Sequence, residues 1–298
     1  GRKSKFRQLR LKMGPQERVA MRVHLYLPTD KPGPYPAIVR IGLGCPAVAE
    51  INRRGYLLAC FEHRDLDPET EGHDVAGPAQ QAYPQYDWGS IAVWAWGASR
   101  LLDYLESRDD VNRAQVVVTG HSRTGKAALL AGAMDRRFAV VVPNGSGCGG
   151  AACYRIAKRG AETLELITRP TRFRSWFQRD FGRFADQENR LPFDQHFLRA
   201  LVAPRAVLTT DALGDHWCNP LGTQAAYQAA QPVFEFLGAP QNNALHFRPG
   251  DHDQLAEDIR VLLDFSDAYF SQRLMAKRFT LLPSPDYHPT YRWRAPEN

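Results

Sequence analysis

The feature that most constrains this chain is a β-branched run that leads through a serine-containing turn into an alanine-rich segment. Residues 116–119 read Val-Val-Val-Thr, and Gly120 and Ser122 follow within three residues. Residues 127–131 read Ala-Ala-Leu-Leu-Ala, and alanine and leucine are strong helix formers. We therefore predict a strand, a sharp turn at Ser122 and a helix over residues 123–134.

A strand, a sharp turn that carries a serine and a helix are how α/β-hydrolases lift a nucleophile above a sheet. The usual pattern of this turn is Gly-x-Ser-x-Gly. Here Thr124 occupies the position of the second glycine, and Gly125 follows it. We interpret the segment as a nucleophile elbow, with an inert strand–helix turn as one alternative.

A second alternative is a P-loop, because residues 120–126 also fit Gly-x-x-x-x-Gly-Lys. A P-loop needs Ser or Thr at the next position to hold Mg²⁺, and this chain has Ala127 there. The bulky side chains of His121 and Arg123 also do not suit a loop that wraps phosphate with bare backbone. The elbow is the favoured interpretation.

Strands and helices are expected to alternate along most of the chain, which indicates a mostly parallel sheet between two helical layers. Together with the elbow, this pattern predicts an α/β-hydrolase fold in a single domain over residues 1–298. Residues 145–201 break the rhythm and are expected to form an insertion over the active-site edge of the sheet. Strands are predicted at 19–27, 37–41, 56–61, 116–119, 138–142, 206–210 and 244–247, and helices at 88–105, 123–134, 223–237 and 255–270.

The composition, 44% hydrophobic and 23% charged residues in 298, is ordinary for a globular enzyme. No run approaches the 18 or more apolar residues of a membrane span, and no signal peptide is visible. The five cysteines form no Cys-x-x-Cys pair, so we expect no zinc site and at least one free thiol.

The net charge of +6 arises partly from a basic N-terminal run. One interpretation is attraction to a polyanion such as nucleic acid or an acidic polysaccharide. The favoured one is a solvated terminal strand or tail, since no interleaved aromatic residues suggest base stacking. The run comprises Arg2, Lys3, Lys5, Arg7, Arg10 and Lys12.

A serine hydroxyl needs a base to take its proton, and α/β-hydrolases supply the partners in the order Ser, acid, His. His252 lies between the last predicted strand and the last predicted helix, where the base is expected. Asp215 and Asp211 both follow the strand at 206–210, and either could orient the imidazole. We favour Asp215.

The oxyanion requires donors already in place. The backbone N–H of Arg123 is one candidate, and the loop of residues 42–45 could offer another. Lys126 lies four residues after Ser122 and therefore on the same side of a helix. Two cations beside the nucleophile suggest an oxygen-rich substrate, although a solvent-facing position is the alternative for Lys126.

With these motifs in view, the sequence resembles the glucuronoyl esterases of carbohydrate esterase family 15, bacterial type. Members typically carry Gly-Cys/His-Ser-Arg-x-Gly-Lys at the elbow and a later Pro-x-x-Ser-Gly-x-Gly-Gly run. The resemblance extends from about residue 36 to residue 270. The matching segments are 88–97, 120–126, 143–150, 191–196, 203–205 and 250–253.

The resemblance implies Ser122 as nucleophile, His252 as base and Arg123 as oxyanion stabiliser. It further implies that Lys126, Glu162 and Trp217 contact the glucuronate ring. The expected partner is a uronic-acid-containing carbohydrate ester of glucuronoxylan or lignin, with no metal, organic cofactor, nucleic acid or membrane. A secreted or periplasmic, monomeric enzyme is expected.

One departure concerns the acid. Fungal members place a glutamate just before the Ser-Gly-x-Gly-Gly run, where this chain has Gly145. Some bacterial members take the acid from a loop after a later strand, which favours Asp215. Two alternatives remain: a broader carbohydrate esterase, such as an acetyl xylan esterase, and a non-catalytic sugar-binding relative.

Overall fold

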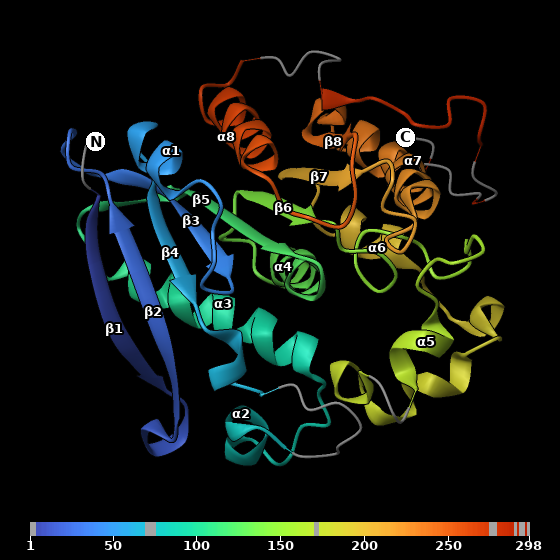
Figure 1. Ribbon diagram of the computed structural model, residues 1–298, viewed down its shortest axis with the longest axis horizontal. Helices are drawn as coiled ribbons and strands as arrows, with labels where there is room; N and C mark the ends of the chain where they lie inside the picture. The colour runs from blue at the N-terminus through green and yellow to red at the C-terminus, as the bar shows by residue number, and fades with distance from the viewer. Residues whose placement is uncertain are drawn as a thin grey trace.

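The computed structural model describes residues 4–68, 76–169, 173–273 and 279–288, together with residues 291 and 296. Its centre is one eight-stranded sheet in the order β1-β2-β4-β3-β5-β6-β7-β8 (Figure 1). The strands are β1 (Lys5–Met13), β2 (Val19–Leu27), β3 (Tyr35–Ile41), β4 (Leu57–Phe61), β5 (Val111–His121), β6 (Val140–Asn144), β7 (Ala206–Ala212) and β8 (Asn243–Arg248).

The strands from β4 to β8 in this order pair in parallel, whereas β1 and β2 join the sheet by antiparallel pairing. Every residue of β4 and β6 is buried, as expected for parallel strands covered on both faces. Because the parallel strands all end at one edge, the loops after β5, β7 and β8 meet there.

Helices cover both faces of the sheet (Figure 1). Buried side chains of α1 and α8 form one core with the sheet, and those of α3, α4 and α7 form the other. The helices are α1 (Val48–Arg53), α2 (Pro78–Ala82), α3 (Ser90–Glu106), α4 (Arg123–Met134), α5 (Leu164–Thr168), α6 (Gln195–Ala200), α7 (Pro220–Phe236) and α8 (Ala256–Phe270).

The seven predicted strands and four predicted helices are all present, and the helix at 123–134 has the predicted ends. The largest shift at a helix start is in α7, which begins at Pro220 instead of residue 223. Proline suits the first turn of a helix, because backbone N–H groups there have no partner within the helix and proline therefore loses no hydrogen bond. The six-residue helix α1 was not predicted.

The basic N-terminal run forms β1, which pairs with β2 along all nine of its residues. Leu9, Leu11 and Met13 alternate with charged residues and turn toward the core. The run is therefore an integral edge strand and not a tail. Arg2 and Lys3 of the predicted basic run lie outside the described residues.

The segment at 145–201 contains α5, α6 and three short 3₁₀ turns. The first of these turns, Arg174–Trp176, brings the buried ring of Trp176 to 5.4 Å from the guanidinium carbon of Arg123. The segment therefore reaches the end of α4 that carries Ser122. Among the described residues, no helix combines the length and apolar character that crossing a membrane would require.

Candidate active site

Ser122 lies at the junction of β5 and α4 with φ 57° and ψ −125°. A positive φ is uncommon for a residue with a side chain, and such strain is often found at functional turns. Gly120 permits this turn, because a Cβ atom there would lie 2.2 Å from the carbonyl oxygen of Thr124. The predicted sharp turn at the serine is thus present.

The displaced second glycine also has a structural explanation. A Cβ atom on Gly125 would lie 2.8 Å from the carbonyl oxygen of Asn144, so α4 approaches β6 closely at this residue. Thr124 instead fills the preceding position, where its hydroxyl bonds the backbone N and O of His121 at 3.0 and 2.9 Å. The elbow therefore tolerates the unusual spacing.

The loop after β8 brings His252 to the elbow. Its Nε2 lies 2.9 Å from Oγ of Ser122, and its Nδ1 lies 2.7 Å from Oδ2 of Asp215. A carboxylate can only accept, so Nδ1 carries the proton and Nε2 accepts from the serine hydroxyl. This tautomer is the one that a general base for Ser122 requires.

The charged forms of His252 and Asp215 stabilise each other. The hydrogen bond to Asp215 raises the pKa of His252 above its ordinary value, against the opposing effect of burial. Burial raises the pKa of Asp215, but hydrogen bonds from His252 and Cys218 outweigh burial and leave that pKa lowered. An ionised Asp215 therefore faces an imidazole that readily takes a proton.

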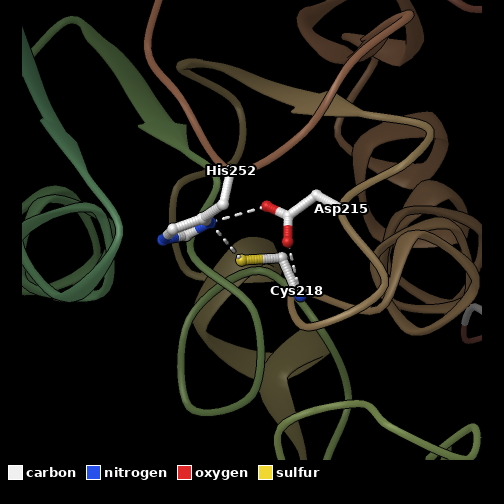
Figure 2. A group of neighbouring side chains, drawn as sticks. All are labelled: Asp215, Cys218 and His252. Carbon is white, nitrogen blue, oxygen red and sulfur yellow. Dashed lines mark hydrogen bonds and ion pairs between the residues drawn. The ribbon is translucent and has the colours of Figure 1, made fainter.

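Cys218 adjoins the pair, with Sγ 3.3 Å from Nδ1 of His252 (Figure 2). The same Sγ lies 3.0 Å from the carbonyl oxygen of Gly145. Donor atoms of Asp215, Cys218 and His252 lie within 4.8 Å of one another, as in some metal sites. Two ligands about 2.0–2.1 Å from a tetrahedral zinc ion would be about 3.3 Å apart. The 2.7 Å between Nδ1 and Oδ2 instead fits a hydrogen bond. All five cysteines are free thiols.

Asp211, the alternative acid, has a different environment. Its Oδ1 accepts the backbone N–H of Gly145 at 2.8 Å, and burial raises its pKa to about 7. Gly145 has φ +50°, and a Cβ atom there would lie 3.2 Å from the ring of His121. A residue with a side chain would be strained at position 145. Asp211 bonds the backbone of this loop, whereas Asp215 bonds His252.

Lys126 is buried within α4, and its Nζ bonds three acceptors. These are the carbonyl oxygens of Ser146 and Cys148, at 2.7 and 2.6 Å, and Oε2 of Glu162, at 2.6 Å. The alternative of a solvent-facing Lys126 is wrong, because the residue is only 2% exposed. An ammonium group has three N–H donors, so every one has a protein acceptor.

Glu162 is equally buried, and burial raises its pKa despite the attraction of Lys126. Its backbone N–H bonds the carbonyl oxygen of Trp217 at 2.9 Å, so the two predicted sugar contacts lie together. The carboxyl Oε1 of Glu162 makes no hydrogen bond within the described parts of the chain. Among the described residues, that oxygen therefore keeps its capacity to accept a hydrogen bond.

Arg123 and the loop of residues 42–45, the candidates for the oxyanion site, follow β5 and β3, which pair in parallel and end at the same edge of the sheet. The guanidinium group of Arg123 packs over the stacked rings of Phe173 and Trp176, at 5.7 and 5.4 Å. His63, next to Gly42, is buried, and burial lowers its pKa to about 4. A cation and a neutral imidazole thus flank this side of the site.

Three residues near the triad were not predicted from the sequence. The ring of His121 lies 4.9 Å from the ring of His252 and bonds the side-chain oxygen of Asn144 at 2.7 Å. Cys218 was given no role in the site, yet it follows Asp215 by only three residues. That spacing is the signal that could have placed its thiol beside the acid.

The fold and this Ser–His–Asp geometry define the class as an α/β-hydrolase with a serine nucleophile elbow. A family model described as "Glucuronyl esterase, fungi" matches residues 13–238. The chain therefore belongs to the glucuronoyl esterase family, carbohydrate esterase family 15.

Individual relatives agree with this assignment. Carbohydrate esterase MZ0003 from an unknown prokaryotic organism is 40% identical over 73% of this chain and 54% of its own length. A family 15 glucuronoyl esterase from Caldicellulosiruptor kristjansonii has a TM-score of 0.84 and 32% identity, covering 96% of this chain and 84% of that one.

A glucuronoyl esterase variant from Sporotrichum thermophile, solved with methyl 4-O-methyl-beta-D-glucopyranuronate, has a TM-score of 0.72 and 25% identity. That match covers 84% of this chain and 69% of the other. The chain spans about half the length of the curated relatives it matches.

Proposed function

We propose that this protein is a serine esterase that hydrolyses esters of glucuronic acid, including 4-O-methyl-glucuronoyl esters that link lignin to glucuronoxylan. The observation that carries the proposal is the hydrogen-bonded series Ser122–His252–Asp215 at a strained elbow. Membership of the glucuronoyl esterase family supports the substrate class.

In the proposed first half-reaction, Nε2 of His252 takes the Ser122 proton and Oγ attacks the C6 carbonyl carbon. Asp215 stabilises the imidazolium that forms. We assign the oxyanion to the backbone N–H of Arg123, supported by the nearby guanidinium charge. His252 then protonates the leaving alcohol, and a glucuronoyl-enzyme remains.

In the second half-reaction, His252 takes a proton from water, and the hydroxide attacks the acyl carbon. Collapse of the tetrahedral species breaks the Ser122–acyl bond and returns the proton to Oγ. No step requires a metal or organic cofactor. The imidazole of His252 acts as base and then as acid in each half-reaction. Its Nε2 faces Ser122, while its Nδ1 stays bonded to Asp215.

For the sugar, we propose that Glu162 and Trp217 contact the glucuronate ring directly. Oε1 of Glu162 would accept a hydrogen bond from a hydroxyl group, and the partly buried Trp217 would pack on the sugar. Lys126 would act mainly through Glu162, because its own donors already have acceptors. We also propose that the protein is secreted or periplasmic and that it is a monomer.

The test compares methyl glucuronate with an acetylated sugar as substrates. A glucuronoyl esterase should hydrolyse the first with the higher kcat/KM. Preference for the acetyl ester would favour an acetyl xylan esterase, and binding of the intact ester without turnover would favour a non-catalytic sugar-binding protein. Each alternative therefore has its own outcome.

A further inference from the structure

Two of the basic residues of β1, Arg10 and Lys12, lie on one face of the β1–β2 hairpin. In the antiparallel register Arg10 pairs with Arg22 and Lys12 with Ala20, and paired residues point to the same face. The hairpin forms one end of the sheet, and its tip lies beside α2 at the lower left of Figure 1. The active-site chemistry uses none of these residues.

A groove of about 490 Å³ runs over this face. Four cations and two carboxylates line it: Arg10, Lys12, Arg18, Arg22, Glu17 and Asp65. Glu17 lies 3.3 Å from Lys12, and Asp65 lies 2.9 Å from Arg22. Among the described residues, Arg10 and Arg18 have no carboxylate oxygen within 4.0 Å.

An aromatic cluster continues the same face beyond the groove. Phe6 is 50% exposed, and its ring centroid lies 5.1 Å from those of His24 and Tyr26. Phe6 pairs with Tyr26 in the register that also pairs Arg10 with Arg22. An exposed ring offers an apolar surface to the C–H face of a sugar, while guanidinium groups bind carboxylates.

The groove also lies at the edge of the sheet that holds the elbow. β1 runs parallel to β5 through two antiparallel pairings, so Met13 and His121 end at the same edge. Four strand spacings of about 4.8 Å place the hairpin roughly 19 Å from β5. A polysaccharide with one ester at Ser122 would need to extend only a few sugar residues to reach it.

We infer that the cationic groove of the β1–β2 hairpin is a second binding site for an acidic polysaccharide whose unesterified uronate branches pair with Arg10 and Arg18. The inference rests on the proposed function, because glucuronoxylan carries both the ester and the free uronates. The groove holds the polymer near the elbow and takes no part in ester hydrolysis.

The experiment measures binding of glucuronoxylan to protein carrying Ser122→Ala, so that the polymer is not hydrolysed. Arg10→Glu with Arg18→Glu should weaken binding about tenfold at low salt and less at high salt, because exposed charge interactions are screened. Lys5→Glu with Arg7→Glu is the matched control. It makes the same charge change on the opposite face of β1 and should leave affinity within about twofold.

Two further measurements make the outcomes distinct. Phe6→Ala should weaken binding of glucuronoxylan, and neutral xylan should bind the groove poorly. Equal losses in both double variants, no loss in either, or equal binding of duplex DNA would overturn the inference. The same double variants with Ser122 intact should retain kcat/KM for methyl glucuronate. Failure of wild type on that substrate would contradict the proposed function instead.

Discussion

The Ser122–His252–Asp215 triad and the Lys126–Glu162 pair lie close together but differ in how fully their hydrogen-bonding groups are occupied. His252 has a 36% exposed side chain, and among the described residues its Nε2 bonds only the serine hydroxyl. Lys126 and Glu162 are 2% and 3% exposed, and Nζ has an acceptor for each donor. The triad can exchange a proton, whereas Lys126 must lose a protein acceptor before it can bind a ligand.

Proximity to a nucleophile therefore does not by itself make a side chain a ligand contact. A buried ion pair is held by its geometry, and removing one partner leaves the other charge in a poorly solvated site. Lys126 also fixes the carbonyl groups of Ser146 and Cys148, which belong to the loop after β6. Its contribution to substrate selection should therefore arise through the position of Glu162.

The largest expected effect is on the triad side. Ser122→Ala should lower kcat for methyl glucuronate by about 10⁴ or more, as removal of a triad nucleophile does in related chemistry. The fold should persist, because the substitution removes only the hydroxyl group and leaves the backbone of the elbow unchanged. A folded variant with near-normal turnover would contradict the nucleophile assignment.

The second prediction separates Asp211, near the end of β7, from Asp215, in the loop that follows. Asp215→Asn should lower kcat on the order of 10²–10⁴, because the imidazolium loses its charged partner. Asp211→Asn retains an acceptor for the N–H of Gly145 and should cost far less. Measurement of kcat for both variants identifies which aspartate is the triad acid. Equal, mild losses in both would mean that the acid is another residue.

Much of the triad side was predictable because its signals are local. The β-branched run, the serine turn and the position of His252 after the last strand fixed two of the three residues. Asp215 and Asp211 stayed open because both follow one strand by a few residues. Only the side-chain directions distinguish them, since Asp211 turns to Gly145 and Asp215 to His252.

The Lys126 side was less predictable because its partners come from distant parts of the chain. Helical spacing placed Lys126 near Ser122, but no sequence pattern predicted that the carbonyl groups of residues 146 and 148 accept its hydrogen bonds. For the basic N-terminal run, the prediction left a solvated strand and a tail open, and the structure shows the strand. Its inward residues alternate as a strand requires, yet the cations between them dominated the interpretation.

The third prediction tests the pair itself. Lys126→Met should lower the free energy of unfolding by about 3 kcal/mol or more, because Glu162 loses its buried partner. Adding Glu162→Gln should restore part of that loss. Urea denaturation of wild type, both single variants and the double variant measures the coupling, and additive losses would show that the pair is not coupled.

The same variants test selectivity. Lys126→Met should reduce kcat/KM for methyl glucuronate by about 10- to 150-fold, the equivalent of one charged hydrogen bond. Hydrolysis of a small aryl acetate should barely change, since the triad is intact. Equal slowing of both substrates would mean that Lys126 supports the catalytic machinery and not the sugar site.

The smallest effect is a shift in pH dependence. His252 must be neutral to accept the Ser122 proton, and the hydrogen bond to Asp215 raises its pKa. The value of kcat/KM should therefore fall as pH decreases through a midpoint above the ordinary histidine value of about 6.5. In Asp215→Asn that bond loses its charge, so the midpoint should move to lower pH.

Asp211 is the control for this profile, because its own pKa of about 7 lies in the same range. Deprotonation of Asp211 as pH rises adds a negative charge behind Asp215, which slightly favours protonated His252. Asp211→Asn should therefore lower the midpoint only a little, whereas Asp215→Asn should lower it clearly. If both variants moved the acid limb equally, the two carboxyl groups would act on His252 as one coupled pair, and the separation of their roles would fail.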